Sequence, residues 1–243
     1  MDFSKIASQL KKIFGRQDPL PATHLPLKRD AYNRSYQMDL RHWLLHHQKE
    51  IVFDKMTWMG TPIWKNPLDV WIYQEILYNV KPDIVVEIGS RFGGSTLFFA
   101  HLLDIIGNGQ VISIDPHRDD FKVTHDRVVV LTGRSDDDHI LAEVAGRCQG
   151  KKVFVIQDGD HSSEQVLRDL NNYSPWVSVG SYLVVEDGIV DLFHHGDGMG
   201  LEIDGPLVAT ERFLKENTNF VADQKCERYL LTYNPKGFLR RIA

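Results

Sequence analysis

The sequence has little cysteine, no excess of positive charge, and no apolar run approaching the roughly 20 residues of a membrane span. Its two cysteines, Cys148 and Cys226, lie far apart and match no metal-ligand spacing, so we expect two incidental thiols in a reducing compartment. The net charge is −5 and the pI is near 6.1, which gives no indication of a general nucleic-acid binder. Lysines interrupt the apolar residues near the N-terminus, so we expect no signal peptide and a cytoplasmic protein.

The N-terminal region differs in amino-acid composition from the rest of the chain. Apolar side chains near one helical face, with lysines between them, predict a basic amphipathic helix in residues 3–14. Such a helix can contact an anionic membrane, pack on another subunit of a homo-oligomer, or fray as a chain end. Prolines in residues 18–26 indicate a linker, and a helix is expected over residues 36–48. We expect an N-terminal extension, residues 1–67, followed by one domain, residues 68–243.

The end of this extension is rich in aromatic residues and proline. Trp58, Trp64 and Trp71 occur with two prolines, so the stretch cannot be one regular element. We interpret it as an ordered loop that leads into a helix over residues 68–80. Its aromatic rings could roof a substrate pocket, because such rings stack on sugars and other rings, or could pack the extension on the domain.

The main motif of the sequence begins at Ile84. Ile84 to Ile88 is a short β-branched run that ends at a glycine, which is typical of a buried parallel strand. A glycine-rich turn follows, and apolar residues then recur at helical spacing from Ser95 to Ile106. Val111 to Ile114 predicts a second strand, which ends in Asp115. This order is typical of a nucleoside-binding βαβ unit: a strand, a glycine loop, a helix, and a second strand that ends in an acid.

The glycine spacing distinguishes this unit from a dinucleotide-binding one. A dinucleotide fingerprint is Gly-x-Gly-x-x-Gly, whereas here Gly89 is followed by Gly93 and Gly94, and Glu87 precedes them. A carboxylate there suits a cationic or hydroxyl-bearing ligand better than a phosphate, which it would repel. The pattern resembles the first motif of class I S-adenosylmethionine-dependent methyltransferases. A different doubly wound protein, such as a nicotinamide-dependent oxidoreductase, is the alternative.

By this resemblance, S-adenosylmethionine would bind at the carboxyl ends of the strands. Glu87, Gly89 and Ser90 would line its methionine end, and Asp115 would hold the ribose hydroxyls. The loop after a third strand, Val128 to Leu131, would meet the adenine. The expected cofactor-binding residues are Glu87, Gly89, Ser90, Gly93, Gly94, Ser95, Asp115, His117, Arg134, Ser135 and Asp158.

Two later strands each end in acidic residues. Asp158 follows the strand Val153 to Ile156, and Glu186 and Asp187 follow the strand Tyr182 to Val185. These strands are expected to be neighbours in a doubly wound sheet, so the three carboxylates would converge at its carboxyl edge. Clustered carboxylates repel one another unless a cation neutralises them, and oxygen ligands favour Mg²⁺, Mn²⁺ or Ca²⁺.

Alternatives to this metal site stay open. The acids could be helix caps and loop residues, and Asp160 is a second choice for the first ligand because it lies two residues farther from the strand. His161 is the nearest candidate for a catalytic general base, with Asp158 beside it, since histidine titrates near neutrality. The start of a helix would explain His161 equally well.

Four short motifs together resemble the cephalosporin hydroxylase-like family, which includes rhamnosyl O-methyltransferases: Glu87-Ile-Gly, Gly93-Gly94-Ser95, Asp158-Gly-Asp-His161 and Glu186-Asp187. The resemblance covers roughly Trp58 to Ile242. It implies a doubly wound, mostly parallel seven-stranded α/β sheet with a magnesium site at Asp158, Glu186 and Asp187. It also implies metal-dependent O-methylation of a small-molecule or glycan acceptor, such as a sugar hydroxyl of a glycolipid or polysaccharide. A non-catalytic adaptor that retains the fold is a further alternative.

The C-terminal part completes the expected sheet. A glycine-rich segment that contains His194 and His195 is expected to form a lid over the metal site. A helix is expected to start at Gly205-Pro206. Residues 229–233 and 238–242 are predicted to form a hairpin, joined by a turn, at an antiparallel edge of the sheet.

Overall fold

The structure is a computed structural model, and it describes residues 38–193, 196 and 200–243. The expected amphipathic helix (3–14), the linker (18–26), and His194 and His195 lie outside the described residues. The chain divides into two units, residues 1–47 and 48–243. The boundary expected after residue 67, the homo-oligomer and the membrane contact stay predictions.

In the first unit, the structure describes one helix, α3 (Leu40–His46), within the range where a helix was expected. The carboxylate of Asp39 caps it by accepting a hydrogen bond from the backbone N–H of His42 at 2.9 Å. A π-helical turn, η1 (His47–Val52), and the short helix α4 (Phe53–Lys55) continue the chain. No helix among the described residues combines the length and the apolar character needed to cross a membrane.

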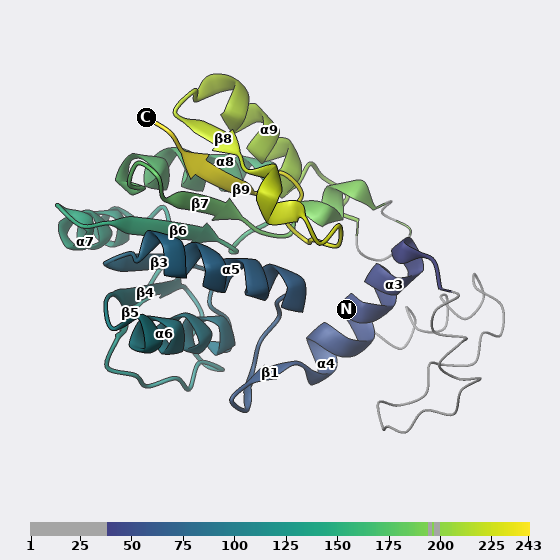
Figure 1. Cartoon of the computed structure of the whole chain (residues 1–243), viewed down its shortest axis with the longest axis horizontal. Coiled ribbons are helices and arrows are strands. Elements are labelled where there is room, and N and C mark those ends of the chain that lie inside the picture. Colours follow the sequence, from purple (N-terminus) through teal and green to yellow (C-terminus); the bar gives the residue numbers. More distant parts are fainter. Residues whose placement is uncertain (1–37, 194–195, 197–199) are drawn as a thin grey trace. The chain divides into compact units, whose positions relative to one another are not determined.

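The second unit is built on a seven-stranded sheet with the strand order β5-β4-β3-β6-β7-β9-β8 (Figure 1). The first five strands of this order, from β5 through β4, β3 and β6 to β7, are parallel. Strand β9 pairs antiparallel with both β7 and β8. This confirms the predicted doubly wound, mostly parallel sheet with an antiparallel edge. The strands are β3 (Ile84–Ile88), β4 (Gln110–Asp115), β5 (Val128–Thr132), β6 (Val153–Gln157), β7 (Tyr182–Val185), β8 (Phe220–Ala222) and β9 (Phe238–Arg241).

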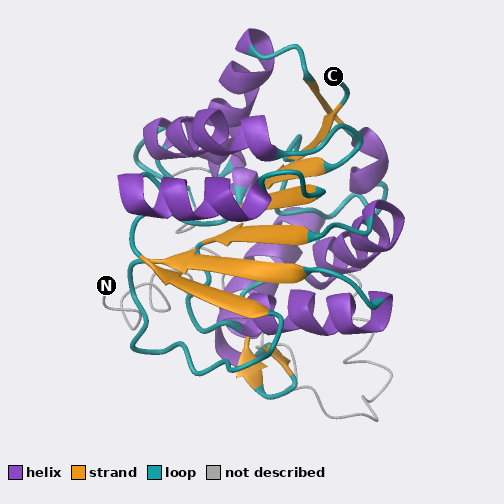
Figure 2. Cartoon of the chain, turned by 90° about the vertical axis from the view of Figure 1, so that its left-hand side faces the viewer, coloured by secondary structure: helices purple, strands orange, loops and turns teal. Residues whose placement is uncertain are grey.

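Helices cover both faces of the sheet (Figure 2). Apolar residues of α7, α8 and α9 share one core with alternate strand residues such as Val86 and Val155, and those of α5 and α6 share the other with Val85 and Phe154. The central strands are therefore buried on both faces, as their continuous apolar runs predicted. The helices are α5 (Pro67–Val80), α6 (Gly94–Ile106), α7 (Asp138–Cys148), α8 (Ser163–Tyr173) and α9 (Pro206–Glu216), and the 3₁₀ turns are η2 (Ser174–Trp176), η3 (Gly188–Leu192) and η5 (Gln224–Glu227).

The aromatic loop before α5 contains a small antiparallel hairpin, β1 (Thr57–Trp58) and β2 (Thr61–Pro62). The loop ends at α5, where the side chain of Asn66 accepts a hydrogen bond from the N–H of Leu68 at 3.1 Å. The expected helix over residues 68–80 is thus confirmed with Pro67 as its first residue, a position that needs no N–H donor.

The predicted hairpin of residues 229–233 with 238–242 is wrong. Strand β9 pairs with β8, and residues 229–233 form no strand. Side chains of the α5 region bind this segment instead: Asp69 accepts hydrogen bonds from the hydroxyl of Thr232 at 2.6 Å and from the N–H of Tyr233 at 2.8 Å. Two backbone groups that a hairpin could use, the N–H of Tyr233 and the carbonyl of Leu231, are therefore paired with side chains more than 160 residues away in sequence.

Candidate functional site

A pocket of about 470 Å³ lies at the carboxyl ends of the parallel strands. Strands β3 and β6 are neighbours here, although the chain passes from β3 to β4 and β5 before it returns to β6. The pocket is therefore at the switch point of the sheet, where open α/β sheets bind their ligands. Of the expected cofactor-binding residues, those that line it are Gly89, Ser90, Gly94, Ser95, Asp115, His117, Arg134, Ser135 and Asp158.

Gly89 allows the loop after β3 to pass close to the loop after β6. Its φ is +82°, and a Cβ atom at this position would lie 2.0 Å from the backbone oxygen of Asp158. Only glycine meets both conditions without displacing one of the loops. The glycine of the sequence motif thus brings the cofactor loop against the loop that carries Asp158.

Asp115 organises the glycine loop through its carboxylate. One oxygen accepts hydrogen bonds from the backbone N–H groups of Ser90 at 3.0 Å and Arg91 at 2.9 Å, and the other accepts one from the N–H of His117 at 2.8 Å. The second oxygen, Oδ1, accepts only one of these bonds and keeps a lone pair, so the side chain can still accept from a hydroxyl group in the pocket.

Arg118 is a structural residue of the site that the sequence analysis missed. Its guanidinium donates hydrogen bonds to the hydroxyl of Ser90 at 2.8 Å and to the carbonyls of Ser113 and Leu131, each at 2.7 Å. It thereby joins the glycine loop to β4 and β5. A single arginine in a polar loop carries no sequence signal for this role.

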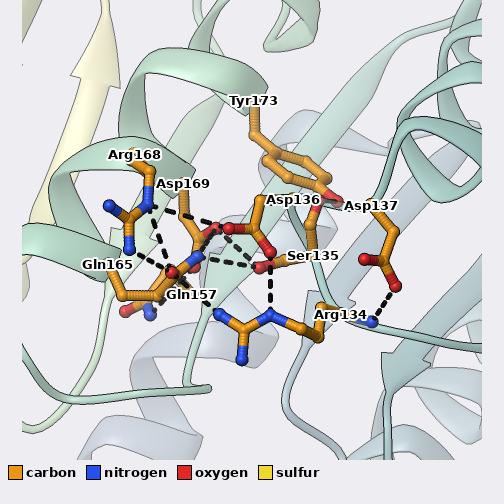
Figure 3. A network of polar contacts seen from close by, with 9 residues as sticks. All are labelled: Arg134, Ser135, Asp136, Asp137, Gln157, Gln165, Arg168, Asp169 and Tyr173. Carbon is orange, nitrogen blue, oxygen red and sulfur yellow. Dashed lines mark hydrogen bonds and ion pairs between the residues drawn. The ribbon is translucent and has the colours of Figure 1, made fainter.

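The pocket wall after β5 rests on a network of polar contacts whose centre, at Ser135, Gln165 and Asp169, is buried (Figure 3). Ser135 donates a hydrogen bond to Asp169 at 2.6 Å, and Tyr173 donates one to the carbonyl of Ser135 at 2.8 Å. Arg134 donates to the side chain of Gln165 at 3.1 Å. Burial raises the pKa of Asp169 to about 6, although hydrogen bonds from the side chains of Ser135, Gln165 and Gln157 favour its charged form.

Two of the expected cofactor residues do not line the pocket. Glu87 is fully buried beneath the loop and accepts a hydrogen bond from the hydroxyl of Thr96. Burial raises the pKa of Glu87, and the charge of Lys65 opposes that change. Gly93, with φ +86°, precedes α6, and a Cβ atom there would meet the side chains of Phe121 and Val123. Their expected contacts with the cofactor stay predictions.

Asp158, His161 and Asp187 come together in the wall of the pocket. Nε2 of His161 lies 3.6 Å from Oδ1 of Asp158 and 3.4 Å from Oδ2 of Asp187, and the ligand atoms of all three residues lie within 4.8 Å of one another. Burial lowers the pKa of His161, but the neighbouring carboxylates outweigh it and raise this pKa to about 9. The three residues could hold a metal ion.

Asp187 is held in an uncommon backbone conformation. Its φ is +57°, and its N–H donates a hydrogen bond to the side-chain oxygen of Asn234 at 3.0 Å. Asn234 in turn donates its N–H to the hydroxyl of Thr232 at 3.0 Å. The segment expected to form a hairpin therefore positions an acid of the site.

Glu186 makes contacts that the sequence analysis did not foresee. The hydroxyl of Tyr73 donates to its Oε1 at 2.6 Å, and the ammonium of Lys65 lies 2.8 Å from its Oε2. Lys65 also donates a hydrogen bond to Asp158. In the described residues, Glu186 is not part of the group whose ligand atoms meet, so its role as a metal ligand stays a prediction.

Burial and neighbouring charges together set the pKa values of this cluster. Burial raises the pKa of Glu186, and the negative charge of Asp158 adds to that effect. Burial also acts to raise the pKa of Asp158, but Lys65 and His161 lower it below its usual value. Burial alone would lower the pKa of Lys65, whereas the two carboxylates raise it above its usual value.

Asp160, the alternative first ligand, makes local contacts. Its side chain is exposed, and its Oδ1 accepts hydrogen bonds from the N–H of Ser162 at 2.7 Å and from the hydroxyl of the same residue at 2.5 Å. These contacts form the turn that precedes α8. The geometry therefore favours Asp158 over Asp160 as a residue of the cluster.

The strand order, the glycine loop after β3 and the acid at the end of β4 define a class I S-adenosylmethionine-dependent methyltransferase fold. A structure of CmcI with Mg and SAM has this fold, with a TM-score of 0.61 and 19% sequence identity over 100% of both chains.

The sequence comparison is more specific than the fold. The profile of the rhamnosyl O-methyltransferase/CmcI family matches residues 50–242, so the chain belongs to this family. Rhamnosyl O-methyltransferase of Mycobacterium tuberculosis is 35% identical over 199 residues, which cover 79% of this chain and 80% of that protein. Its counterpart in Mycobacterium leprae is 35% identical over 199 residues, covering 78% and 85%. The predicted family is thus confirmed, and the chain is an S-adenosylmethionine-dependent O-methyltransferase.

Proposed function

We propose that the chain transfers the methyl group of S-adenosylmethionine to a hydroxyl of a sugar, and that it uses a divalent metal ion to do so. The observation that carries this proposal is the convergence of Asp158, His161 and Asp187 in the pocket that Gly89 and Asp115 also line. The names of the mycobacterial relatives support a rhamnosyl acceptor, and the CmcI structure with Mg and SAM supports the metal.

The residues of the cluster fit a hard divalent ion. Nε2 of His161 is buried and has no hydrogen-bond partner among the described residues, although two carboxylates lie within 3.6 Å of it. Buried carboxylates next to one another are costly unless a cation balances them. Asp158 and Asp187 would supply oxygen ligands of the kind that Mg²⁺, Mn²⁺ and Ca²⁺ prefer, with Glu186 as the predicted third carboxylate.

The pocket also fits the methyl donor. Asp115 points its carboxylate at the glycine loop, and its Oδ1 keeps a lone pair for a ribose hydroxyl. Gly94 and Ser95 begin α6, where a side chain at Gly94 would collide with the carbonyl of Pro62, its Cβ lying 2.2 Å from that oxygen. Gly94 therefore allows the start of α6, which lines the pocket, to pack against the backbone of Pro62.

For the reaction, the chain has to orient an acceptor hydroxyl and remove its proton. When bound, a divalent ion would lower the pKa of a hydroxyl that it contacts. His161 is the residue placed to accept the proton, at Nε2, because this atom faces the cluster. At neutral pH His161 is protonated as long as the carboxylates are not neutralised, so it can act as a base only when a cation compensates them.

Aromatic side chains at the rim support a sugar as acceptor. Trp64 and Phe92 line the pocket with their ring centroids 5.0 Å apart, and the ring centroid of Phe53 lies 4.8 Å from that of Trp64. Trp64 is 40% exposed and could stack on the apolar face of a sugar ring.

The test is calorimetric titration of S-adenosylmethionine and then Mg²⁺ into the full chain, followed by a methyl-transfer assay with a rhamnosyl glycoside. Asp158→Asn should abolish Mg²⁺ binding and methyl transfer. Asp160→Asn is the matched control and should retain both, because the carboxylate of Asp160 accepts its hydrogen bonds from Ser162, in the turn before α8. The proposal fails if the wild type does not bind S-adenosylmethionine, or if the glycoside is not methylated with Mg²⁺ present. Loss of metal binding in Asp160→Asn alone would make Asp160 the ligand.

A further inference from the structure

Lys65 is the only buried lysine of the described residues, and it lies inside the acidic cluster. It is 4% exposed, and its ammonium contacts Asp158 and lies 2.8 Å from Oε2 of Glu186. A buried ammonium is stable only when it is paired, so these contacts define the position of its charge.

The backbone on both sides of Lys65 is held in place. The carbonyl of Pro62 packs against Gly94, and Asn66 both caps α5 and donates a hydrogen bond to the carbonyl of Leu231 at 3.1 Å. The backbone of Lys65 is therefore anchored on one side at β2 and on the other at α5, and its side chain extends from this fixed backbone to the carboxylates.

Asp158 is shared between two positive groups. Its Oδ2 faces Lys65, and its Oδ1 lies 3.6 Å from Nε2 of His161. A cation held by the carboxylates of Asp158 and Asp187 would therefore share Asp158 with the ammonium of Lys65.

We infer that Lys65 is an internal counter-cation that competes with a divalent metal ion for the carboxylates of Asp158 and Glu186. It holds these side chains together when no metal is bound, and it lowers the affinity of the site for the metal. Lys65 thus acts through the two carboxylates as a positioning residue. This inference rests on the metal site of the proposed function.

The physical reason is the balance of charge. Four buried or half-buried carboxylates, those of Glu87, Asp158, Glu186 and Asp187, lie at this edge of the sheet, where Lys65 supplies a fixed positive charge. Two cations that share one carboxylate repel each other. Removing the ammonium should therefore strengthen metal binding while it destabilises the metal-free protein.

The test is calorimetric titration of Mg²⁺ into EDTA-treated full-length protein, comparing the wild type with Lys65→Met. Methionine keeps a long unbranched side chain and removes the charge. We expect Mg²⁺ to bind about ten-fold more tightly or better, because charges a few ångström apart in a protein interact by more than the free energy of a ten-fold change. The melting temperature of the variant should be lower than that of the wild type in EDTA, and Mg²⁺ should raise it by more.

Two controls separate this effect from others. Lys151→Met removes the same charge next to the amino end of β6, outside the pocket, and should leave Mg²⁺ affinity unchanged. If Lys65→Met does not fold, Glu186→Gln is compared with the double variant Lys65→Met/Glu186→Gln, which removes both members of one ion pair. The double variant should bind Mg²⁺ more tightly than Glu186→Gln.

The outcomes distinguish the two proposals. Unchanged or weaker Mg²⁺ binding in Lys65→Met, with normal binding in the wild type, overturns the role of Lys65 alone. If neither the wild type nor any Lys65 variant binds Mg²⁺, the metal site of the proposed function is wrong as well. Binding by the variant but not by the wild type would support the competition.

Discussion

Replacing Gly89 with alanine should disrupt the site by displacing one loop from another. The added Cβ would lie 2.0 Å from the backbone oxygen of Asp158, whereas Cβ contacts below 3.0 Å essentially do not occur, so the loops must separate by about 1 Å. Hydrogen bonds on either side resist this movement: Gly89 donates to the carbonyl of Ile114 and Asp158 to that of Ile88, each at 2.8 Å.

The magnitude follows from two contributions. A left-handed backbone costs a residue with a Cβ atom about 1–2 kcal/mol, and an overpacked contact costs about 1–3 kcal/mol more. Gly89→Ala should therefore lower the free energy of unfolding by about 2–5 kcal/mol. Gly107→Ala is the matched control, because Gly107 has φ +83° but a Cβ atom added there would meet no atom within 4 Å, so only the backbone cost of about 1–2 kcal/mol applies.

The assay is urea unfolding of the wild type and both variants, with S-adenosylmethionine affinity measured on each folded protein. We expect Gly89→Ala to weaken cofactor binding by about ten-fold or more, because Gly89 and Asp158 both line the pocket. Gly107→Ala should bind as the wild type does. Equal losses of stability in the two variants, or unchanged cofactor affinity in Gly89→Ala, would refute the close approach of the two loops as the reason for this glycine.

Three further predictions address the base, the loop and the polar network. His161→Gln should reduce the rate of methyl transfer by about a hundred-fold or more in single-turnover kinetics, with S-adenosylmethionine affinity unchanged in calorimetry. A rate equal to that of the wild type would exclude His161 as the base. Arg118→Met should lower the free energy of unfolding by about 2–3 kcal/mol, because three polar groups lose a charged donor, and an unaltered urea midpoint would contradict this. The raised pKa of Asp169, about 6 against 3.8, stabilises the fold at low pH, and this contribution is lost as the pH rises through 6. Relative to Asp169→Asn, the wild type should therefore lose about 2 kcal/mol of unfolding free energy between about pH 4 and pH 7, and parallel pH profiles would argue against it.

Much of the fold could be predicted because its signals are local. The limits of β3 and β7 agree with the predicted runs Ile84 to Ile88 and Tyr182 to Val185, since each is a continuous apolar stretch bounded by polar or glycine residues. The convergence of Asp158 with Asp187 also followed from the sequence, because parallel strands that are neighbours end at one edge of the sheet.

The misjudged parts depend on contacts between distant residues. Residues 229–233 resemble a strand locally, but Asp69, 163 positions before Thr232, binds their backbone and side chains. Likewise, nothing near Lys65 in sequence indicates its partners, because Asp158 is 93 positions away.

By itself, the sequence determined the order of strands and helices, the glycine loop and the strand ends that carry acids, because hydrophobic periodicity and glycine conformation act over a few residues. Only the tertiary structure decided which atoms meet at those ends. It placed His161 between Asp158 and Asp187, and it placed the ammonium of Lys65 against Glu186. Such pairings form where separate segments are buried together, since a charge removed from water must find a partner wherever the fold provides one.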